Sequence, residues 1–178
     1  MRCSISKTVL ACELGKLDIF CCSQGVHRIC ISQENGNKLD TESKKSMLES
    51  GVFPTMSSVA LWFTSYFTSA SDSSKMPLPP ICPEVFSKEG KFTEKVWKTL
   101  MMNVPVGETV SYAYLAALSG NNRASRAVGT AMKKNPIQII IPCHRVLKSD
   151  GSLGEYSGGK NIKEWLINHE NKCVVMNT

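Results

Sequence analysis

A serine- and proline-rich stretch near the middle of the chain, residues 69–83, limits the possible folds more than any other feature. Its sequence SASDSSKMPLPPICP suits a linker better than a helix or a strand, because proline lacks a backbone N–H and serine competes for backbone hydrogen bonds. A chain of 178 residues is long enough for one domain or two small ones. We therefore place a boundary near residues 70–86 and expect domains over residues 1–86 and 87–178.

The composition excludes several classes of protein. Hydrophobic residues make up 42% of the chain and charged residues 20%, and no apolar run approaches the roughly 20 residues of a membrane-spanning helix. No apolar segment follows Arg2 and Lys7, so we expect no signal peptide and an intracellular protein. Its eight cysteines are then reduced, metal-bound or catalytic. A net charge of +6 permits an anionic partner such as nucleic acid without requiring one.

Short apolar runs separated by turn residues occupy the N-terminal region. From Ser4 to Ser32 they predict three short antiparallel strands in a meander. Residues 33–49 are polar and charged, which predicts a loop. Apolar side chains at helical spacing over residues 58–67 predict a helix that covers the sheet.

The C-terminal region is predicted to be mainly helical. Thr93 is a suitable N-cap for a first helix with one apolar face. A second, short helix follows Thr109 or Ser111, and a third spans residues 123–134 and ends at Asn135-Pro136. The two short helices and the tight turn between them have the spacing of a helix-turn-helix.

The third of these helices has one apolar and one basic face. Its predicted core positions are Ala124, Ala127, Val128, Ala131 and Met132, and its outward positions are Arg123, Arg126, Thr130, Lys133 and Lys134. Such a slim basic helix is able to approach even the DNA minor groove, which is about 6 Å wide. Arg126 is then the residue best placed to fill a gap in the base stack. The alternative is a solvated basic face without a ligand.

The residues IIIPCHRV place a thiol directly after a uniformly apolar run. The β-branched segment Ile139–Ile141 predicts a strand that is buried on both faces and ends at Pro142. Cys143 is then either an inert packed thiol or a nucleophile. His144 is able to activate the thiol only if the chain bends at Pro142 or a water bridges the two side chains.

Three segments follow this cysteine. Lys148–Gly151 predicts a hairpin turn, and Gly154–Gly159 predicts a flexible loop whose N–H groups and hydroxyl suit a flat polar ligand. Asn161 caps the final helix, which ends near Glu170. Glu170 is either the third residue of a Cys-His-Glu arrangement, in which it orients His144, or a solvated carboxylate at the end of the helix.

The motifs PCHR, EYSGG and KEWLINHE, with the basic helix pair ending in Asn-Pro, resemble the O6-alkylguanine-DNA alkyltransferases, or methylated-DNA–protein-cysteine methyltransferases. The resemblance covers Phe92–Glu170 densely and, to the animal members, the N-terminal region more loosely. It implies an α+β fold of two domains. The first is a small antiparallel sheet with a covering helix, and the second is mainly helical with a winged helix-turn-helix and a short buried active-site strand.

The resemblance also implies direct-reversal DNA repair. The protein would bind double-stranded DNA in the minor groove, flip out O6-methylguanine or another O6-alkylguanine, and transfer the alkyl group irreversibly to its own cysteine in a single turnover. Cys143 would be the acceptor, His144 would act as base through a water, and Glu170 would orient His144. Tyr112 would crowd the phosphate and donate a proton toward guanine N3, while Arg126 would occupy the space left by the flipped base.

Further roles follow from the same resemblance. The implied DNA-binding residues are Arg123, Arg126, Ala127, Gly129, Tyr112, Asn121 and Ser149. The implied pocket residues are Tyr156, Ser157, Val146, Asn135, Lys163 and Gln138, with Asn135 linking the recognition helix to the active-site segment.

The animal-type resemblance implies one structural zinc ion and no organic cofactor. Cys3, Cys22 and His27 match three family ligands in type and spacing, and Cys82 aligns with the fourth, a histidine. A Cys₃His set is an accepted tetrahedral zinc site, although a slip of one residue at Cys82 would leave it incomplete. The resemblance further implies a nuclear protein without membrane association and a monomer, with cooperativity on DNA left open.

Two residues depart from the family pattern, and two other classes of function stay open. Gln138 stands where many animal members have a proline, and Glu155 replaces an asparagine before Tyr156. We expect methyl repair to survive and reaction with benzyl-type pseudosubstrates to weaken, because a polar side chain replaces an apolar wall. The alternatives are a DNA-binding regulator without chemistry, against which Cys143 argues, and a cysteine hydrolase that turns over repeatedly.

Overall fold

The computed structural model describes residues 3–32 and 54–175, with side chains as far as residue 172. The chain divides into two compact units, Met1–Val85 and Phe86–Thr178. The loop predicted over residues 33–49 lies outside the described residues. No helix in the described part of the chain is long and apolar enough to cross a membrane.

The first unit contains the predicted three-stranded meander, which is confirmed. Strands β1 (Ser6–Cys12), β2 (Gly15–Cys22) and β3 (Gly25–Ser32) form an antiparallel sheet in the order β1-β2-β3. Alternation along β2 buries Leu17 and Ile19, which pair with Leu10 and Ile29 of the neighbouring strands.

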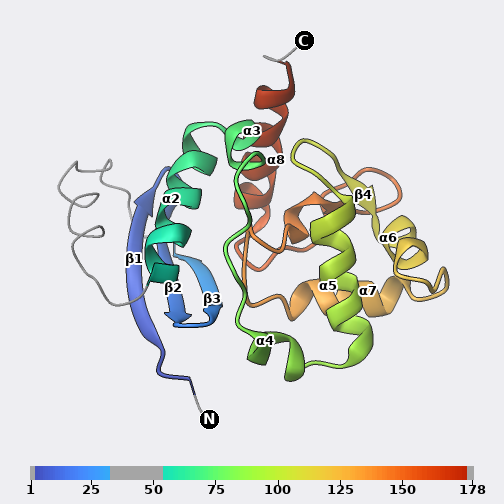
Figure 1. Ribbon diagram of the computed structural model, residues 1–178. Coiled ribbons are helices and arrows are strands. Elements are labelled where there is room, and N and C mark those ends of the chain that lie inside the picture. Colours follow the sequence, from blue (N-terminus) through green and yellow to red (C-terminus); the bar gives the residue numbers. More distant parts are fainter. Residues whose placement is uncertain (1–2, 33–53, 176–178) are drawn as a thin grey trace. The chain divides into compact units, whose positions relative to one another are not determined.

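A helix packs on this sheet, as predicted, and is longer than the sequence pattern indicated. Figure 1 shows α2 (Pro54–Thr68) lying along the sheet, and its buried Val59, Phe63 and Tyr66 fall at helical spacing. The expectation that residues 69–83 lack regular structure is wrong at its start, because α3 (Ala70–Ser73) forms there with Ala70 buried. Burial of one small apolar residue is a tertiary effect that composition does not reveal.

The second unit is built mainly from helices. Their bounds are α5 Lys91–Asn103, α6 Tyr112–Leu118, α7 Ser125–Lys133 and α8 Lys160–Val175. The short α4 (Pro83–Ser87) precedes them and includes the boundary between the two units. The prediction of Thr93 as N-cap is wrong, because Gly90 takes that position, and α8 begins one residue before its predicted cap, Asn161. Ser111 is confirmed as the cap of α6, since its hydroxyl accepts a hydrogen bond from the Tyr114 N–H at 3.0 Å.

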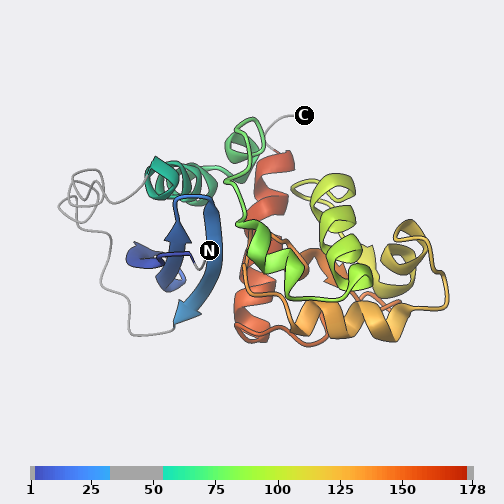
Figure 2. The same cartoon turned by 60° about the horizontal axis from the view of Figure 1, so that its bottom comes forward.

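Helices α5, α6 and α7 pack against one another, and Figure 2 shows α7 lying along one edge of this unit beside α6. The buried Trp97 of α5 donates a hydrogen bond from Nε1 to the Ala131 carbonyl of α7 at 2.9 Å. The predicted core face of α7 is correct for Val128, Ala131 and Met132 but wrong for Ala127, which is exposed. Ala127 lies one turn before Ala131 on nearly the same side of the helix, so the buried face of α7 narrows toward its start.

The predicted buried strand at Ile139–Ile141 is buried but is not a strand. Its residues form a turn with a single bridge between Gln138 and Ile141, and Ile139 has a φ of 72°. This left-handed conformation is strained for a β-branched residue. The run of isoleucines indicated burial correctly, but the described residues offer no neighbouring strand with which it could pair.

Two short strands complete the unit. β4 (Val110–Ser111) and β5 (Val146–Leu147) pair in parallel. The hairpin predicted at Lys148–Gly151 is therefore wrong as a hairpin, since no antiparallel partner of β5 follows in the described chain. A tight turn forms there instead, in which the Gly151 N–H donates to the Lys148 carbonyl at 3.0 Å.

Candidate functional site: a buried thiol in a pocket beside a basic helix

Cys143 lies at the first residue of a short 3₁₀ turn, Cys143–Arg145, immediately after Pro142. The Cys143 N–H donates to the Ile141 carbonyl at 2.8 Å, and the Arg145 N–H donates to the Pro142 carbonyl at 2.9 Å. These bonds bend the chain sharply. Cys143 is 4% exposed, so it lies at the inner wall of the pocket rather than on the outer surface.

The side chain of Asn135 fixes the thiol relative to the end of α7. Asn135 Nδ2 donates to the Ile141 carbonyl at 2.8 Å and to Cys143 Sγ at 3.0 Å, and its Oδ1 accepts from the Ile137 N–H at 2.9 Å. One buried amide thus joins the helix terminus, the isoleucine turn and the sulfur.

Behind the thiol, His144, Arg145 and Glu170 form a buried ionic network. His144 Nε2 lies 2.7 Å from Glu170 Oε1, and Arg145 contacts both carboxylate oxygens through Nε and Nη2 at 2.9 Å each. Arg145 Nη1 also donates to the Val104 carbonyl at 2.7 Å, and the Gly107 N–H donates to Glu170 at 3.2 Å. His144 and Glu170 are essentially inaccessible to solvent. Of the two alternatives for Glu170, the solvated carboxylate is therefore wrong, and the contact with His144 is present.

The electrostatics of this network leave His144 neutral and Glu170 ionised. Burial lowers the pKa of His144 despite the neighbouring carboxylate. Burial alone would raise the pKa of Glu170, but His144 and Arg145 hold it well below its usual range. Glu170 therefore accepts the Nε2 hydrogen, and Nδ1 of His144, which has no hydrogen-bond partner among the described residues, is left as an acceptor.

The thiol itself is protonated at rest. Burial raises the pKa of Cys143 to about 11, although the Asn135 amide and the charge of Lys163 both favour the thiolate. Lys163 is fully buried, donates to the Val146 carbonyl at 2.6 Å, and has its pKa lowered by burial to about 8. A base is needed to generate the nucleophile, and the buried imidazole next in the chain is neutral at pH 7.

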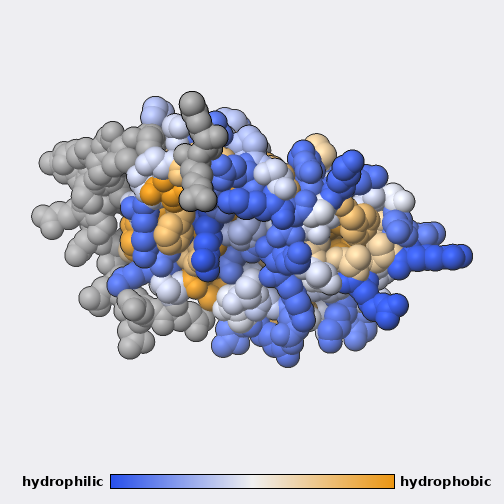
Figure 3. Space-filling view, turned by 90° about the horizontal axis from the view of Figure 1, so that it is seen from below, coloured by the Kyte–Doolittle hydropathy of each residue, from blue (hydrophilic) through white to orange (hydrophobic). Residues whose placement is uncertain are grey.

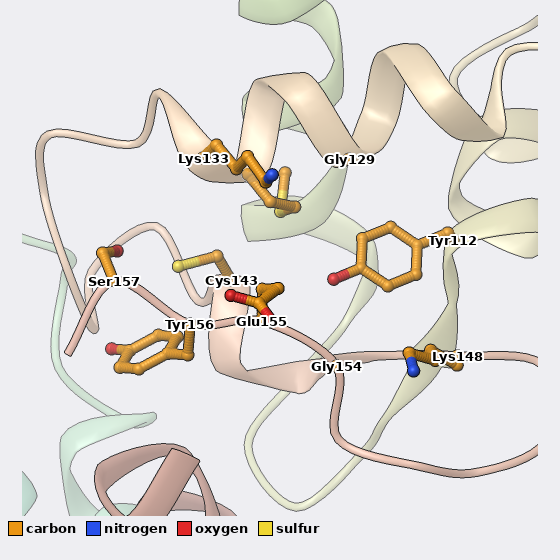
Figure 4. Close-up of a pocket in the computed structure, with 10 residues that line it drawn as sticks. Tyr112, Gly129, Lys133, Cys143, Lys148, Gly154, Glu155, Tyr156 and Ser157 are labelled. Atoms are coloured by element: carbon orange, nitrogen blue, oxygen red, sulfur yellow. The ribbon is translucent and has the colours of Figure 1, made fainter. Parts of the chain in front are cut away.

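A pocket of about 390 Å³ opens onto the sulfur, a size usual for a small-molecule site of about 300–1,000 Å³. Figure 4 shows Cys143 with Tyr156 and Ser157 on one side and Tyr112 on the other. Burial raises the pKa of Tyr112, and the negative charges of Cys143 and Glu155 raise it further. Burial also raises the pKa of Tyr156 well above its usual value. The lining residues are Tyr112, Gly129, Met132, Lys133, Cys143, Lys148, Gly154, Glu155, Tyr156 and Ser157.

The pocket adjoins the basic face of α7. Arg126, Ala127, Thr130 and Lys133 are exposed on that helix, and Gly129 carries no side chain that would hold another surface away. Lys134 Nζ lies 2.8 Å from Glu89, so it is already paired, whereas Arg126 and Lys133 have no ion-pair partner in the described part of the chain. Figure 3 shows one face of the second unit, which is largely hydrophilic around an apolar patch. Tyr114 and Leu118 of α6 are among the exposed apolar residues.

Known proteins match this chain over nearly its whole length. The family "6-O-methylguanine DNA methyltransferase, DNA binding domain" matches residues 91–172. The methylated-DNA–protein-cysteine methyltransferase of Homo sapiens is 40% identical over 170 residues, which cover 94% of this chain and 81% of that protein. The chain belongs to the methylated-DNA–protein-cysteine methyltransferase family.

Solved structures agree with this assignment. Mycobacterium tuberculosis OGT in complex with DNA is 26% identical, with a TM-score of 0.71 and coverage of 93% of this chain and 92% of that one. The O6-methylguanine-DNA methyltransferase of Pyrococcus kodakaraensis is 25% identical, with a TM-score of 0.56 and coverage of 94% and 99%. The α+β fold class is confirmed.

The residues to which the family resemblance gave roles fall into three groups in this methyltransferase. Those that line the pocket are Tyr112, Gly129, Cys143, Tyr156 and Ser157. Those that contact or support the sulfur segment from behind are Asn135, His144, Val146, Lys163 and Glu170. Those exposed on the surface are Asn121, Arg123, Arg126, Ala127 and Ser149. Gln138 belongs to none of these groups, because it is buried in the bridge with Ile141 and does not line the pocket.

A second cluster of sulfur and nitrogen atoms lies within the first unit. The ligand atoms of Cys3, Cys22, His27 and Cys82 all lie within 4.8 Å of one another, and the sulfurs of Cys3 and Cys82 are 3.7 Å apart. That spacing fits a tetrahedral zinc site, whose Zn–S bonds of about 2.3 Å place two sulfurs about 3.8 Å apart. The Gln24 N–H donates to Cys22 Sγ at 3.2 Å, as backbone donors do at zinc-bound thiolates.

The backbone packs closely around this cluster. The Cys82 N–H donates to the Val26 carbonyl at 3.0 Å, and the Val26 N–H donates to the Pro80 carbonyl at 2.8 Å. Gly25, with a φ of 152°, leaves room for this contact, since a Cβ there would lie 2.5 Å from the Cys82 nitrogen. The start of β3 and residues 80–82 are thereby held together at the cluster.

Sequence reasoning missed several residues at the pocket. Arg145, which lies behind the pocket on Glu170, receives no role from the sequence, although a buried carboxylate facing a neutral imidazole needs a cation. Met132, Lys133, Lys148 and Gly154 also line the cavity. The signal for Lys133 and Lys148 was their position, one at the end of the basic helix and one just past the cysteine motif, but only tertiary structure brings them to one opening.

Proposed function

We propose that this protein repairs O6-alkylguanine in double-stranded DNA by moving the alkyl group to Cys143. The observation that carries the proposal is the placement of the Cys143 thiol at the wall of a base-sized pocket, with Asn135 holding the sulfur and the His144–Glu170–Arg145 network directly behind it. The human relative is named for this chemistry, and the solved mycobacterial relative was crystallised with DNA.

Recognition begins with the basic face of α7 in the minor groove. Lysine and arginine contacts with phosphates supply affinity that does not depend on sequence. The pocket lies beside this helix, and a base reaches it only when it is rotated out of the duplex. Arg126 is exposed at the start of α7 and is the side chain that would occupy the vacated place in the base stack, with Ala127 and Gly129 allowing close approach.

Transfer is a displacement at the alkyl carbon. The sulfur of Cys143 forms a bond to that carbon as the bond from carbon to guanine O6 breaks, and the electron pair of the broken bond stays on the guanine. The thiol proton passes to Nδ1 of His144, directly or through a water, because Glu170 occupies Nε2. Glu170 and Arg145 are positioning residues in this account, since they act through His144.

The departing guanine needs one proton. The Tyr112 hydroxyl lines the pocket and remains protonated because its pKa is raised, so it is suited to donate toward guanine N3 while the imidazolium returns a proton to the phenolate. The Tyr156 ring, the Ser157 segment and backbone groups near Cys143 and Val146 would surround the base. The product thioether has no easy return to a thiol, so each chain reacts once and no organic cofactor is required.

The four clustered ligands of the first unit would hold one structural zinc ion. Cys3, Cys22, His27 and Cys82 supply the soft sulfur and imidazole donors that zinc prefers, at the spacing described above. The ion would tie the N-terminal end of the chain to β3 and to the segment at Cys82. Its chemistry is structural, because the four protein ligands complete the tetrahedral set.

DNA is the proposed partner, and the nucleus is the proposed place of action, in keeping with the chromosomal substrate. A single chain carries every residue named in the transfer, which supports action as a monomer.

The test uses duplex DNA that carries O6-methylguanine with a labelled methyl group. We expect one labelled methyl per chain, located on Cys143, and restored guanine in the DNA. The Cys143→Ala variant should bind the duplex and acquire no label. Repeated turnover would favour a hydrolase, and binding without transfer by the unsubstituted protein would favour a regulator; either result would overturn the proposal.

A further inference from the structure

Lys148 lines the Cys143 pocket, yet the transfer described above does not use it. It is the first residue after β5, and two backbone hydrogen bonds set its turn: its N–H donates to the Ser152 carbonyl at 2.9 Å, and its carbonyl accepts from the Gly151 N–H at 3.0 Å. The backbone at Lys148 is therefore fixed, while the exposed end of its side chain reaches the pocket opening.

The stem of Lys148 lies close to the Tyr112 hydroxyl, across Gly154. A Cβ atom at Gly154 would lie 3.5 Å from Tyr112 Oη and 3.6 and 3.8 Å from Lys148 Cγ and Cε. Gly154 has a φ of 67°, a conformation that glycine adopts without strain, so no side chain stands between the two. The ammonium of Lys148 is thus carried to the same part of the pocket opening as the Tyr112 phenol.

Lys148 has no ion-pair partner among the residues that the structure describes. Figure 4 shows Lys133 and Lys148 on different sides of the pocket, one from the end of α7 and one from the segment after β5. A nucleotide whose base enters this pocket leaves its own two phosphodiesters at the opening, because the sugar cannot follow the base. Two separated cations at the opening match two separated anions.

We infer that Lys148 binds a backbone phosphate of the extruded nucleotide, beside Tyr112, and so positions the lesion for transfer. The inference rests on the proposed function and adds to it a residue that acts only on DNA. Lys148 contributes nothing to the displacement at the alkyl carbon, so its effect is confined to substrates that carry a phosphate.

The experiment compares Lys148→Gln with Lys148→Arg and with Lys160→Gln, a matched removal of an exposed lysine that does not line the pocket. Each protein reacts with duplex DNA containing O6-methylguanine and with the free base O6-methylguanine. Lys148→Gln should transfer methyl from the duplex about tenfold more slowly at subsaturating protein, since a charge-assisted contact is lost. The slope of log affinity against log salt should fall by about 0.9. Lys148→Arg and Lys160→Gln should behave like the unsubstituted protein, and all four should react equally with the free base.

A second arm locates the phosphate. In two further duplexes, a neutral methylphosphonate replaces the phosphate on the 5′ or the 3′ side of the lesion. At one of these positions the unsubstituted protein should slow to the rate of Lys148→Gln, and the variant should slow no further.

Three results would overturn the inference. In the first, Lys148→Gln matches the unsubstituted protein on every duplex and has an unchanged salt slope. In the second, it loses reactivity toward the free base by the same factor as toward the duplex, which indicates a structural role. In the third, the rate loss of Lys148→Gln adds in full to the rate loss caused by each of the two methylphosphonates. Failure of the unsubstituted protein to transfer methyl from either substrate would instead overturn the proposed function, and this inference with it.

Discussion

In residues 1–85, three cysteines and a histidine turn their ligand atoms toward one another within 4.8 Å, whereas in residues 86–178 Cys143 faces a pocket in which no other lining residue is a cysteine. Burial raises the pKa of Cys3 to about 12 and that of Cys143 to about 11. A raised thiol pKa therefore occurs in both regions and does not distinguish them. Their neighbours differ: mutual sulfur contacts suit a shared metal ion, while an amide, a lysine and a neutral imidazole suit a reaction.

Charge separates the two regions in the same way. Residues 86–178 hold thirteen lysines and arginines and seven acidic residues, a net charge of +6, whereas residues 1–85 hold eight of each. The whole net charge of the chain thus belongs to the region that contains Cys143. Affinity for an anionic polymer is expected to reside there.

The largest effect is expected from Glu170→Gln, which leaves Arg145 buried without its anion. Removal of one partner from a buried ion pair costs about 3–5 kcal/mol, so the free energy of unfolding should fall by about that amount, and methyl transfer should slow because His144 loses its orientation. Urea denaturation and single-turnover kinetics measure the two effects. Glu164→Gln, an exposed position on the same helix, is the control, and equal behaviour of the two variants would contradict the network's role.

Metal removal should separate the two cysteine sites. Chelation of zinc, or Cys82→Ala, should lower the thermal midpoint of unfolding, since a ligand at 100 times its dissociation constant stabilises by about 2.7 kcal/mol. Labelled methyl should still be transferred to Cys143 below that midpoint. Cys143→Ala should abolish methyl transfer and leave both the thermal midpoint and the zinc content, measured by metal analysis, unchanged. Zinc-free protein with unaltered unfolding would show that the cluster is no metal site.

Acid should lower the stability of the second region through the buried pair of His144 and Glu170, which is independent of the metal site. The pKa of His144 is lowered in the folded protein, so the unfolded state takes up that proton first and stability falls as the pH drops below about 6.5. The pKa of Glu170 is also lowered, so its contribution is present above about 4.3 and is lost below it. Unfolding at fixed urea from pH 8 to pH 3 should show both declines, and Glu170→Gln should lack the second one.

Arg126→Ala should affect DNA substrates alone. Loss of the side chain that fills the base stack should slow transfer from duplex O6-methylguanine about tenfold, because extrusion of a base costs a few kcal/mol. Transfer from the free base should be unchanged. Lys172→Ala removes an exposed cation elsewhere in the second region and should leave both rates unchanged. An equal loss of rate in both variants would show that Arg126 contributes only positive charge to DNA binding.

The smallest effect is expected at Gln138. Gln138→Pro should raise the rate of inactivation by a benzyl-type pseudosubstrate by no more than about tenfold, with methyl transfer unaltered. Because Gln138 lies in the bridge with Ile141 rather than in the pocket lining, its influence would pass through the isoleucine turn. An unchanged benzyl rate would show that this departure from the family pattern has no consequence.

Local sequence signals predicted the parts of the fold that local forces determine. Alternation and turn residues located the three strands, helical spacing located α2, and the hydroxyl of Ser111 marked the start of α6. The strand predicted at Ile139–Ile141 failed because an apolar run reports burial and not backbone conformation, and the left-handed Ile139 depends on the Asn135 bonds around it.

The candidate site was accessible from sequence where a motif specified it. The cysteine motif pointed to Cys143 and His144, and the family pattern supplied Glu170 and Asn135. Arg145 and Lys148 could not be assigned in advance, because one is buried by a helix distant in sequence and the other reaches the pocket across Gly154. Both depend on packing that a single sequence does not record.

The comparison between the two cysteine sites can be tested in one measurement. The protein is incubated with duplex DNA carrying labelled O6-methylguanine, digested, and every cysteine peptide is examined by mass spectrometry. We predict one labelled methyl per chain, wholly on Cys143, with none on Cys3, Cys22 or Cys82. Label shared with those cysteines, or none on Cys143, would contradict the account.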